Sequence, residues 1–421
     1  MNKVDTNQTE ASQLRNCWAL DQSVAYLNHG SFGACPTAVL DQQRMYRDQL
    51  EAEPVQFLTR NAQPLLDASR QTLGGFLGAN PDDIAFVANA TGGVNAVLRS
   101  LEWEAGDELL VTDHAYNACR NVLDWIAHRT AAKVVVVHVP FPVESSDQVL
   151  QAITQKVTSR TRIALIDHVT SISALVMPIK KIVVSLQQQG VDVLVDGAHA
   201  PGMVPLNVQQ IGAAYYAGNC HKWLCAPKGA GFVCVRPDRQ DRIVPTVVSH
   251  GYNKQRKGST RFHDLFDWCG TVDPTPWLCV GHAIEYMRSL LPGGWQEVMQ
   301  RNSALAFEAQ QLLVKQLGIE SPVPRGMLGS IATVPIPPDP TGKMRVDEDT
   351  VPTPAPVLQA ELLRQYQIEV PIQYWPAGPD RVLRISAQLY NDRDQYVYLC
   401  KSLSALLEKE MEMQVSSNNE S

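Results

Sequence analysis

The chain has 421 residues, of which 45% are hydrophobic and 19% are charged, and its formal net charge at pH 7 is -7. This composition is typical of a folded globular protein and differs from that of disordered, fibrous or membrane proteins. The negative charge, without any block of lysine or arginine, disfavours nucleic-acid binding, and the length predicts one large and one smaller domain.

The N-terminal residues 1–20 are polar and contain no apolar segment of the kind found in signal peptides. No apolar run approaches membrane-spanning length, so no contact with a membrane is expected. The nine cysteines include no CxxC pair, which argues against both a disulfide framework and a zinc site. We therefore expect reduced thiols, a cytoplasmic location and no metal.

Short apolar runs rich in Val and Ile recur through about residue 288, with segments of helical character between them. This alternation predicts an α/β fold with a largely parallel sheet covered by helices on both faces. The helical segments include residues 91–101 and residues 185–190, and the second closes with a glycine suited to a helix C-cap. The predicted strands are residues 84–90, 108–114, 133–139, 162–169, 191–199, 213–223 and 231–237.

The pattern changes after that point, and a second lobe is expected to begin. A helix starts near Leu291 with apolar residues at helical spacing and is expected to stop at Gly318. Prolines and charges over residues 337–356 are typical of an exposed loop. The other predicted elements are a strand at 330–337, a helix at 357–367, strands at 368–375 and 381–390, and a final helix before the polar tail 414–421.

Two polar residues end successive predicted strands: Asp196 in LVDGAHA and Lys222 in YYAGNCHKWL. In an open parallel sheet, ligands bind at this carboxyl edge. A lysine and a carboxylate are what pyridoxal phosphate (PLP) requires, because the amine forms a Schiff base and the carboxylate keeps the pyridine nitrogen protonated. Spacing alone fits equally well a surface lysine and an aspartate that caps a helix.

A glycine-containing turn precedes these residues in the chain. Thr91, Gly92 and Gly93 lie between a predicted strand and a predicted helix. Backbone N–H groups and the positive end of a helix dipole can hold a phosphate there, and glycine permits close approach of the backbone. Such a turn is often only a turn, but its place before Asp196 and Lys222 favours phosphate binding.

The ordered motifs from YLNHGSFG (residues 26–33) to LRISAQLYN (residues 383–391) resemble the fold-type I PLP enzymes of the aminotransferase class V family. This family includes the cysteine desulfurases, and the resemblance is strongest to its isopenicillin N epimerase-like branch. It implies a mostly parallel seven-stranded sheet in a large PLP-binding domain and a smaller α+β C-terminal domain. The implied boundaries are residues 1–34 for an N-terminal arm that joins the small domain, 35–288 and 289–421.

The resemblance also implies which residues hold the cofactor. Thr91 and Gly92 would bind its phosphate together with Asn219 and His221, although relatives more often carry serine or threonine at the position of Asn219. Lys222 would carry the cofactor, and Asp196 would face its pyridine nitrogen, as the residues themselves indicate.

Further contacts to the cofactor follow from the same resemblance. Tyr116 stands where desulfurases stack a histidine on the ring, and an aromatic side chain can stack equally well. His114 is the alternative candidate. Ser171 and His199 would approach the ring oxygen, and His199 would also approach the imine.

The substrate and a second subunit are implied in the same way. Arg384 would grip the substrate carboxylate, for which a guanidinium group offers bidentate geometry. Asn28 and His29 would lie near the substrate. Thr271 would reach the phosphate of a neighbouring subunit, so the resemblance implies a homodimer with shared active sites.

The resemblance implies that the reaction begins when Lys222 takes the Cα proton of an amino-acid substrate. Desulfurases carry a cysteine shortly before the carboxylate-binding arginine, but residues 368–384 contain none. We therefore expect an isopenicillin N epimerase-like enzyme that acts on an amino acid or an amino-acid-bearing substrate. The alternative is a C–S lyase of the cysteine desulfhydrase or cysteine-sulfoxide lyase type, and a transaminase or a desulfurase is less favoured.

Overall fold

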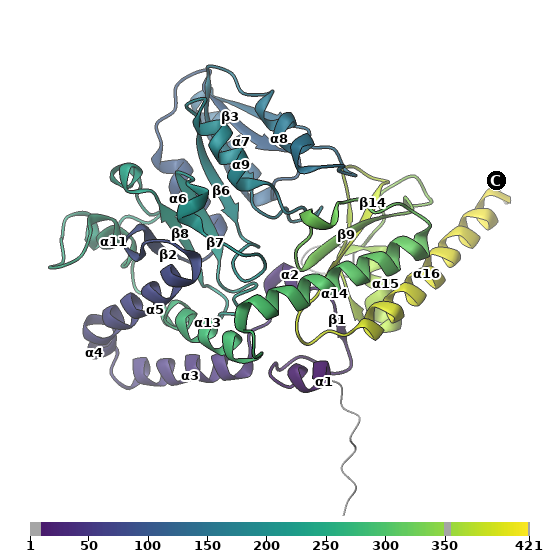
Figure 1. The fold of residues 1–421 in the computed structure, drawn as a ribbon, viewed down its shortest axis with the longest axis horizontal. Coiled ribbons are helices and arrows are strands. Elements are labelled where there is room, and N and C mark those ends of the chain that lie inside the picture. The colour runs from purple at the N-terminus through teal and green to yellow at the C-terminus, as the bar shows by residue number, and fades with distance from the viewer. Residues whose placement is uncertain (1–9, 349–354, 420–421) are drawn as a thin grey trace, which may run out of the picture.

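The computed structural model describes residues 10–348 and 355–419. The chain forms a large lobe around a seven-stranded sheet and a smaller lobe around a three-stranded sheet, which lie side by side in Figure 1. Residues 1–9 of the predicted polar N-terminus, residues 349–354 of the predicted loop and residues 420–421 of the predicted tail lie outside the described residues.

The large sheet has the strand order β2-β8-β7-β6-β5-β3-β4, and β8 alone runs antiparallel to the other strands. This confirms the predicted α/β fold with a mostly parallel seven-stranded sheet. The first predicted strand ends early, at Val87, because Asn89 caps a helix that begins at Ala90. The strands are β2 (Ile84–Val87), β3 (Glu108–Thr112), β4 (Lys133–Val137), β5 (Thr161–Asp167), β6 (Asp192–Gly197), β7 (Tyr215–Asn219) and β8 (Gly231–Val235).

Helices cover both faces of this sheet, because alternate residues of a strand point to opposite sides. On β5, Ala164 packs into one hydrophobic core with α5, α8, α9 and α13, whereas Leu165 packs into a second core with α6, α7 and α11. The helices of the large lobe are α3 (Thr37–Ala52), α4 (Pro54–Gln56), α5 (Ala62–Leu77), α6 (Ala90–Ser100), α7 (Asn117–Thr130), α8 (Ser146–Thr154), α9 (Ile179–Gln187), α10 (Val208–Ile211), α11 (Arg261–Phe266), α12 (Thr275–Leu278) and α13 (Val280–Ser289).

The helix predicted over residues 185–190 begins earlier and ends earlier than expected. Apolar residues at helical spacing, from Ile179 through Ile182 and Leu186, are buried and form one face of α9. The turn that follows closes at Gly190, whose φ of 77° is the left-handed conformation that glycine favours. Gly190 therefore closes the turn that follows α9, whereas the C-cap of the helix is Gln188.

The smaller lobe packs two long helices against an antiparallel sheet of order β13-β14-β9 (Figure 1). Its first helix stops at Gly318, which has a φ of 65°, as predicted. Its last helix continues to Asn419, past the predicted start of the polar tail at Gln414. The elements are α14 (Gly294–Leu317), β9 (Ile331–Ile336), β10 (Val346–Asp347), β11 (Ala355–Pro356), α15 (Val357–Tyr366), β12 (Ile368–Glu369), β13 (Ile372–Tyr374), β14 (Arg381–Ser386) and α16 (Arg393–Asn419).

The single strand predicted over residues 368–375 is wrong, because the structure divides it into β12 and β13. The break falls at Val370 and Pro371, and proline has no backbone N–H to donate into a strand ladder. β12 pairs with β1 of the N-terminal segment, whereas β13 pairs with β14. The proline therefore divides one apolar run between two sheets.

The described part of the predicted loop, residues 337–348, is mostly exposed, as expected, and Asp339 is the exception. Asp339 is only 3% exposed and binds Arg345 with two hydrogen bonds of 2.9 and 3.0 Å. Asp339 also accepts a hydrogen bond of 2.9 Å from the hydroxyl of Tyr374. Charged residues are usually exposed unless they are paired, and here the pairing permits burial.

The N-terminal segment joins the smaller lobe and then reaches the large one. Its elements are α1 (Glu10–Arg15), β1 (Ala25–Tyr26) and α2 (His29–Phe32), and β1 pairs in parallel with β12. Gly33, which follows α2, has a φ of 72°, and a Cβ added there would lie 2.1 Å from the carbonyl oxygen of His221. Only glycine fits this contact beside Lys222. The predicted domain boundaries after residues 34 and 288 remain predictions.

Gly33→Ala is expected to lower the free energy of unfolding by more than about 3 kcal/mol, since backbone strain of roughly 1–3 kcal/mol is added to a backbone collision. Gly190→Ala is the matched control, because Gly190 also has a positive φ, of 77°, but nothing within 4 Å of an added Cβ. Urea denaturation of both variants checks this. Equal losses would show that the contact with His221 contributes nothing.

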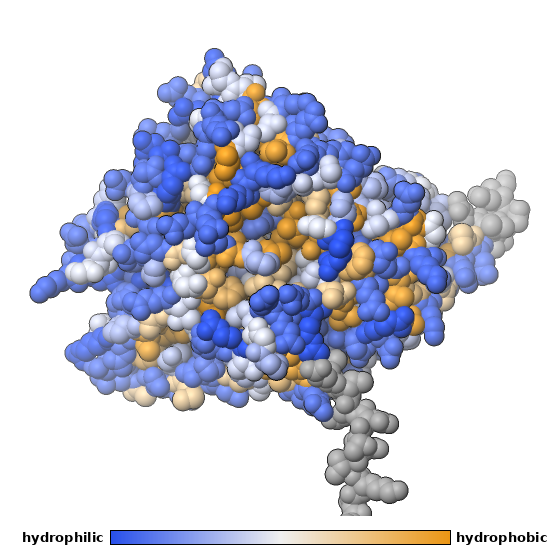
Figure 2. Space-filling view, in the orientation of Figure 1, coloured by the Kyte–Doolittle hydropathy of each residue, from blue (hydrophilic) through white to orange (hydrophobic). Residues whose placement is uncertain are grey.

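The face of the molecule in Figure 2 is largely hydrophilic, and hydrophobic side chains gather in its middle, where the lobes meet. A cavity of about 840 Å³ is lined by residues 203–206 of the large lobe and by α14 residues such as Met299. Its walls are mainly aliphatic and carry no pair of charged groups that could hold a polar ligand.

All nine cysteines carry free thiols. Within residues 10–348 and 355–419, no helix is both long and apolar enough to span a membrane. The same residues contain no group of His, Cys, Asp and Glu side chains that is arranged to bind a metal ion.

Candidate active site

A cavity of about 310 Å³ lies where β5, β6 and β7 end. Ser31 and Phe32 of the N-terminal segment form part of its wall, as do Asn89 and Asp167 of the large lobe. The carboxyl edge of the sheet is therefore the floor of the cavity, as expected for an open parallel sheet. The cavity brings together eight residues singled out from the sequence: Thr91, Tyr116, Ser171, Asp196, His199, Asn219, His221 and Lys222.

Lys222 follows β7 and reaches into this cavity. Its Nζ lies 3.2 Å from Nε2 of His199. The pKa of Lys222 is lowered to about 8, first because burial penalises the charged form and then because the positive charge of Arg384 repels it. A lysine of this kind is neutral much more often than an exposed one, and only the neutral amine is a nucleophile or a base.

His199 is oriented by Trp223, a residue that the sequence did not single out. The indole Nε1–H of Trp223 can only donate, and it donates to Nδ1 of His199 over 3.3 Å. In a neutral imidazole the proton therefore sits on Nε2, which faces Lys222. Burial and the charge of Lys222 hold the pKa of His199 well below its usual value. The Nε2–H can donate to the amine of Lys222 only when that amine is neutral, because an ammonium group has no lone pair.

Asp196 ends β6 and is only 2% exposed. Its carboxylate accepts a hydrogen bond of 3.1 Å from the thiol of Cys119 and one of 3.0 Å from the N–H of Ala198. These contacts hold the carboxylate at the wall of the cavity. Asp167, at the end of β5, lines the same cavity although the sequence did not single it out. The sequence carries the same indication for Asp167 as for Asp196, because both aspartates lie at the ends of buried apolar strands.

The N-terminus of α6 opens onto the cavity at Thr91. The first N–H groups of a helix have no acceptor within the helix. Gly92 N donates to Oδ1 of Asn89 and Ala90 N donates to Oδ1 of Asn219, each over 2.8 Å. The N–H of Thr91 has no acceptor within the described residues. The helix end therefore leaves one backbone donor at the wall of the cavity.

Two aromatic side chains were candidates for a ring contact, and only one lines the cavity. Tyr116 precedes α7, lines the cavity and is 47% exposed. His114 is buried, and its ring nitrogens contact Oγ of Ser173 at 2.6 Å and the carbonyl oxygen of Val139 at 2.8 Å. Both nitrogens of His114 are thus occupied within the protein.

His221 lines the cavity. Its Nδ1 lies 2.9 Å from the carbonyl oxygen of Ala230, so Nδ1 carries a proton and donates it. The pKa of His221 is lowered to about 4, mainly by burial. In the neutral ring, Nε2 is therefore an acceptor.

Arg384 lies on β14 and is 5% exposed. Its Nη1 donates to the carbonyl oxygen of Ser171 at 2.6 Å, and its Nη2 donates to Oγ of Ser31 at 2.8 Å. Nε has no hydrogen-bond partner, and no carboxylate within the described residues forms an ion pair with this guanidinium. Burial lowers the pKa of Arg384 to about 10, so it stays charged at neutral pH. A buried cation without an anion indicates a site for an acidic ligand.

Asn28 contacts Arg384, and His29 contacts the backbone of Lys222. Oδ1 of Asn28 lies 3.5 Å from Nη2 of Arg384, and Nδ2 of Asn28 donates to Oε1 of Glu369 at 2.9 Å. His29 is fully buried, and its ring nitrogens contact the hydroxyl of Tyr390 at 2.8 Å and the backbone oxygen of Lys222 at 3.0 Å. Neither residue lines the cavity.

Thr271 does not meet the cavity within one chain. It is exposed, in a turn after Gly270, whose φ is 107°. Its neighbour Val272 is also exposed, at 49%.

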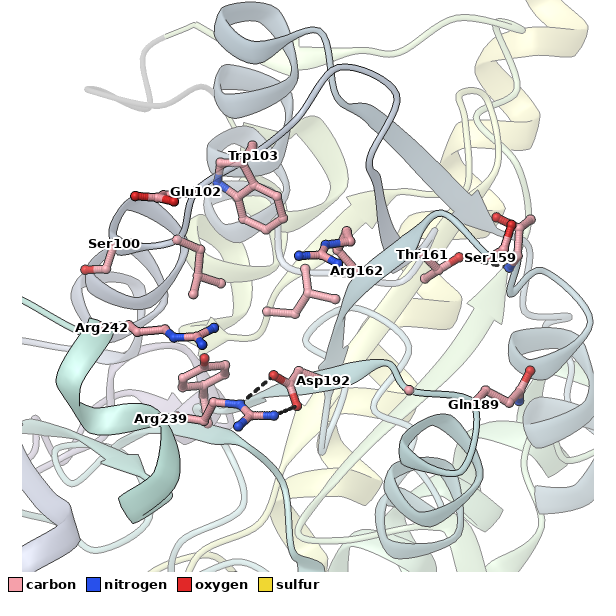
Figure 3. Close-up of a pocket in the computed structure, with 15 residues that line it drawn as sticks. Ser100, Glu102, Trp103, Ser159, Thr161, Arg162, Gln189, Asp192, Arg239 and Arg242 are labelled. Atoms are coloured by element: carbon pink, nitrogen blue, oxygen red, sulfur yellow. Dashed lines mark hydrogen bonds and ion pairs between the residues drawn. The ribbon is translucent and has the colours of Figure 1, made fainter.

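A larger cavity, of about 770 Å³, lies at the opposite edge of the sheet, where β5, β6 and β7 begin (Figure 3). Arg239 donates to both carboxylate oxygens of Asp192 there, at 2.8 and 3.2 Å (Figure 3), and the other charged residues that line it are Glu102, Arg162 and Arg242. No lysine and no helix N-terminus with a free donor lines it. The smaller cavity at the carboxyl edge is therefore the candidate active site.

Comparison with known proteins gives a consistent result. The family model described as Aminotransferase class-V matches residues 25–337. The chain is 33% identical over 402 residues to an isopenicillin N epimerase of Amycolatopsis lactamdurans, covering 92% of this chain and 96% of that protein. It is 30% identical over 411 residues to a chloroplastic protein of Arabidopsis thaliana named "probable L-cysteine desulfhydrase", covering 92% and 84%.

A solved structure shares the fold. It is a mutant of C-DES in which glycine is covalently linked to the PLP cofactor, with a TM-score of 0.74 and 20% sequence identity. The similarity covers 91% of this chain and 96% of that chain. The two-lobed arrangement described above is therefore the fold of that enzyme.

Proposed function

Because the chain belongs to the aminotransferase class V family, we propose that it is a PLP-dependent enzyme that removes the Cα proton of an amino acid or of an amino-acid-bearing substrate. One observation carries the proposal: Lys222, Asp196 and the N-terminus of α6 meet in a single cavity. Homologues of the chain are epimerases and C–S lyases, and both classes begin with this proton transfer.

The residues of the cavity fit PLP. Thr91 would hold the phosphate at the N-terminus of α6 through its N–H, which is unpaired among the described residues, and Gly92 would join it by exchanging its present acceptor, Oδ1 of Asn89 at 2.8 Å, for a phosphate oxygen. Asp196 would face the pyridine nitrogen, and the amine of Lys222 would bond the aldehyde carbon. When bound, PLP supplies an electron sink for the charge left at Cα.

The remaining predicted cofactor contacts are part of the proposal. Tyr116 would stack on the ring, and Ser171 and His199 would approach its oxygen. Asn219 would act chiefly by holding the N–H of Ala90, which fixes the phosphate loop. His221 would have to gain a proton to donate to the phosphate, because its neutral ring offers only a lone pair at Nε2.

Arg384 would bind the substrate carboxylate, which its unpaired guanidinium lacks in the protein itself. Asn28 and Ser31 would orient this guanidinium through their contacts with Nη2. For His29 we propose a positioning role behind Lys222 in place of a substrate contact, because both of its ring nitrogens are used within the protein.

Lys222 would then act as the base. Its lowered pKa of about 8 lets the amine accept a proton from Cα and return one near neutral pH. The Nε2–H of His199 holds the amine in place, and Trp223 holds His199.

The rate at which PLP bonds to the protein should rise about tenfold per pH unit below pH 8 and level off above it, since only the neutral amine reacts. The titratable groups around the amine are Arg384, Asp196, Cys119 and Asp167, and all of them are included in this shift. Stopped-flow absorbance of the apoprotein mixed with PLP measures the rate. A rate that still rises at pH 10, as for a free lysine amine, would contradict the lowered pKa.

Epimerisation is the reaction that we place first, because the isopenicillin N epimerase is 33% identical along nearly the whole chain. C–S lysis is the alternative, favoured by the 30% identity to a plant cysteine desulfhydrase. A desulfurase needs a cysteine nucleophile, and no cysteine lines the cavity in the described part of the chain.

Mass spectrometry of products in deuterated buffer separates these reactions. D- and L-amino acids and cysteine derivatives are mixed with the protein and PLP. Deuterium at Cα without a keto acid indicates an epimerase, whereas pyruvate from a cysteine derivative indicates a C–S lyase. A keto acid that keeps the substrate side chain indicates a transaminase. If no substrate exchanges its Cα proton, the proposed function is wrong.

We further propose a homodimer in which Thr271 reaches the phosphate site of the partner subunit. The exposure of Thr271 and of its apolar neighbour Val272, which is 49% exposed, is consistent with such a contact. A fully active monomer in analytical ultracentrifugation at assay concentration would contradict this.

The free thiols support the proposed cytoplasmic location, which fluorescence microscopy of the tagged protein in its host would test. Limited proteolysis that releases no fragment near residues 34 or 288 would count against the proposed domain boundaries.

A further inference from the structure

Asp167 and Asp196 occupy matching places on neighbouring strands. β5 and β6 are parallel, and Asp167 is the register partner of Asp196 at the end of this ladder. Register partners on adjacent strands point to the same face of a sheet, and both aspartates line the candidate active site. They are 4% and 2% exposed, so two carboxyl groups are buried side by side.

Neither carboxyl group has a cationic partner in contact. No ion pair joins Asp167 or Asp196 to a basic side chain within the described residues. Asp196 has two donors, the thiol of Cys119 and the N–H of Ala198. The backbone N–H of Tyr116 acts on Asp167 and partly offsets the rise in its pKa. The described protein thus supplies hydrogen bonds but no neutralising charge in contact.

Two carboxylates in such a place cannot both stay ionised. Like charges a few ångströms apart in a buried site raise the pKa of one group strongly, and the pair then keeps one proton. Burial, and next the charge of Asp196, raise the pKa of Asp167 well above its usual value. The titratable groups that interact with the pair from other elements are Cys119 on α7, Tyr216 on β7 and Lys222 after β7.

We propose that Asp167 and Asp196 form an acid pair that retains one proton at neutral pH, carried mainly by Asp167. The protonated Asp167 acts as a positioning residue, which donates a hydrogen bond to the ionised Asp196. The pair then carries a single negative charge. This matches the single positive charge of a protonated pyridine nitrogen. The inference rests on the proposed function only for the identity of that cationic partner.

Infrared spectroscopy tests the proton directly. The spectrum of the Asp167→Asn protein at pH 7 is subtracted from that of the wild type, before and after PLP is added. If the acid pair exists, the wild type shows the C=O stretching band of a protonated carboxylic acid, and Asp167→Asn removes that band both without and with PLP. Asp147→Asn is the matched control, since Asp147 is exposed and paired with Lys181, and it should remove only carboxylate bands. If Asp167→Asn also removes only carboxylate bands, the acid pair does not exist.

A second comparison separates the hydrogen bond from a merely structural role. Asparagine keeps an N–H donor at this position, whereas alanine has none. Asp167→Ala is expected to lower PLP affinity and kcat/KM at least about tenfold, as expected for a lost hydrogen bond to a charged group, while Asp167→Asn stays within about threefold of the wild type. Equal losses in two folded variants would overturn the positioning role.

The outcome is distinguishable from failure of the proposed function. If the wild type forms no yellow absorption band with PLP, the proposed function is wrong. The infrared band of the protein without PLP still decides whether the acid pair exists. A yellow band without the carboxylic acid signal would overturn the pair and leave the proposed function in place.

Discussion

Replacing Lys222 by alanine is expected to lower kcat/KM by at least about 10³-fold and to abolish the yellow absorption band that PLP forms with the wild type. The variant loses both the amine that bonds the cofactor and the base that moves the Cα proton, and each role alone contributes about 10²- to 10⁴-fold. Absorption spectra and steady-state rates with PLP in excess measure both effects.

Two further variants make this result specific. Lys222→Arg keeps a positive charge in the cavity but cannot bond the cofactor, so it should be as inactive as Lys222→Ala. Lys181→Ala removes an exposed lysine paired with Asp147 and should behave as the wild type. If Lys222→Ala keeps the yellow band and turns over substrate, the assignment of Lys222 is wrong.

Replacing Arg384 by alanine is expected to lower kcat/KM by about 30-fold to several thousand-fold for amino-acid substrates. The estimate corresponds to the roughly 2–5 kcal/mol lost when one partner of a buried, hydrogen-bonded charge pair is removed. Arg384 is 5% exposed and has no carboxylate partner within the described residues, so the substrate would be its counter-ion. If Arg384 binds the carboxylate equally tightly in the ground state and in the transition state, most of the loss should appear as a higher KM.

A substrate analogue without a carboxylate separates this role from damage to the fold. The amine that corresponds to the amino acid should react at the same rate with the wild type and with Arg384→Ala, because the missing partner removes the interaction. Arg393→Ala is the surface control, since Arg393 pairs with Glu308 and both are exposed. An Arg384→Ala protein with an unchanged kcat/KM for amino acids would contradict carboxylate binding by this residue.

The fold class could be predicted because strand and helix patterns alternate regularly through the large lobe. Boundaries were less certain where one residue overrides a pattern, as Pro371 does between β12 and β13. The antiparallel direction of β8 could not be predicted, since a buried apolar run has the same composition in either direction. Burial of Asp339 was also hidden, because its partner Tyr374 is distant in the sequence.

The candidate site could be predicted where a residue type has a specific task at a strand end, as for Asp196 and Lys222. Contacts that depend on three-dimensional neighbours could not. The indole of Trp223 fixes the tautomer of His199, but nothing in the local sequence indicates which nitrogen it reaches. The pairing of Asp167 with Asp196 requires the strand register, and a contact of Thr271 requires a second chain.

Reductive trapping of PLP on the purified protein tests the central claim most directly. The protein is mixed with PLP and treated with borohydride, and its peptides are then mapped by mass spectrometry. We expect one PLP group per chain, bound to Nζ of Lys222 in the peptide after β7. A label on any other lysine, or no label under conditions that saturate the protein with PLP, would contradict the assignment of this cavity as a PLP site.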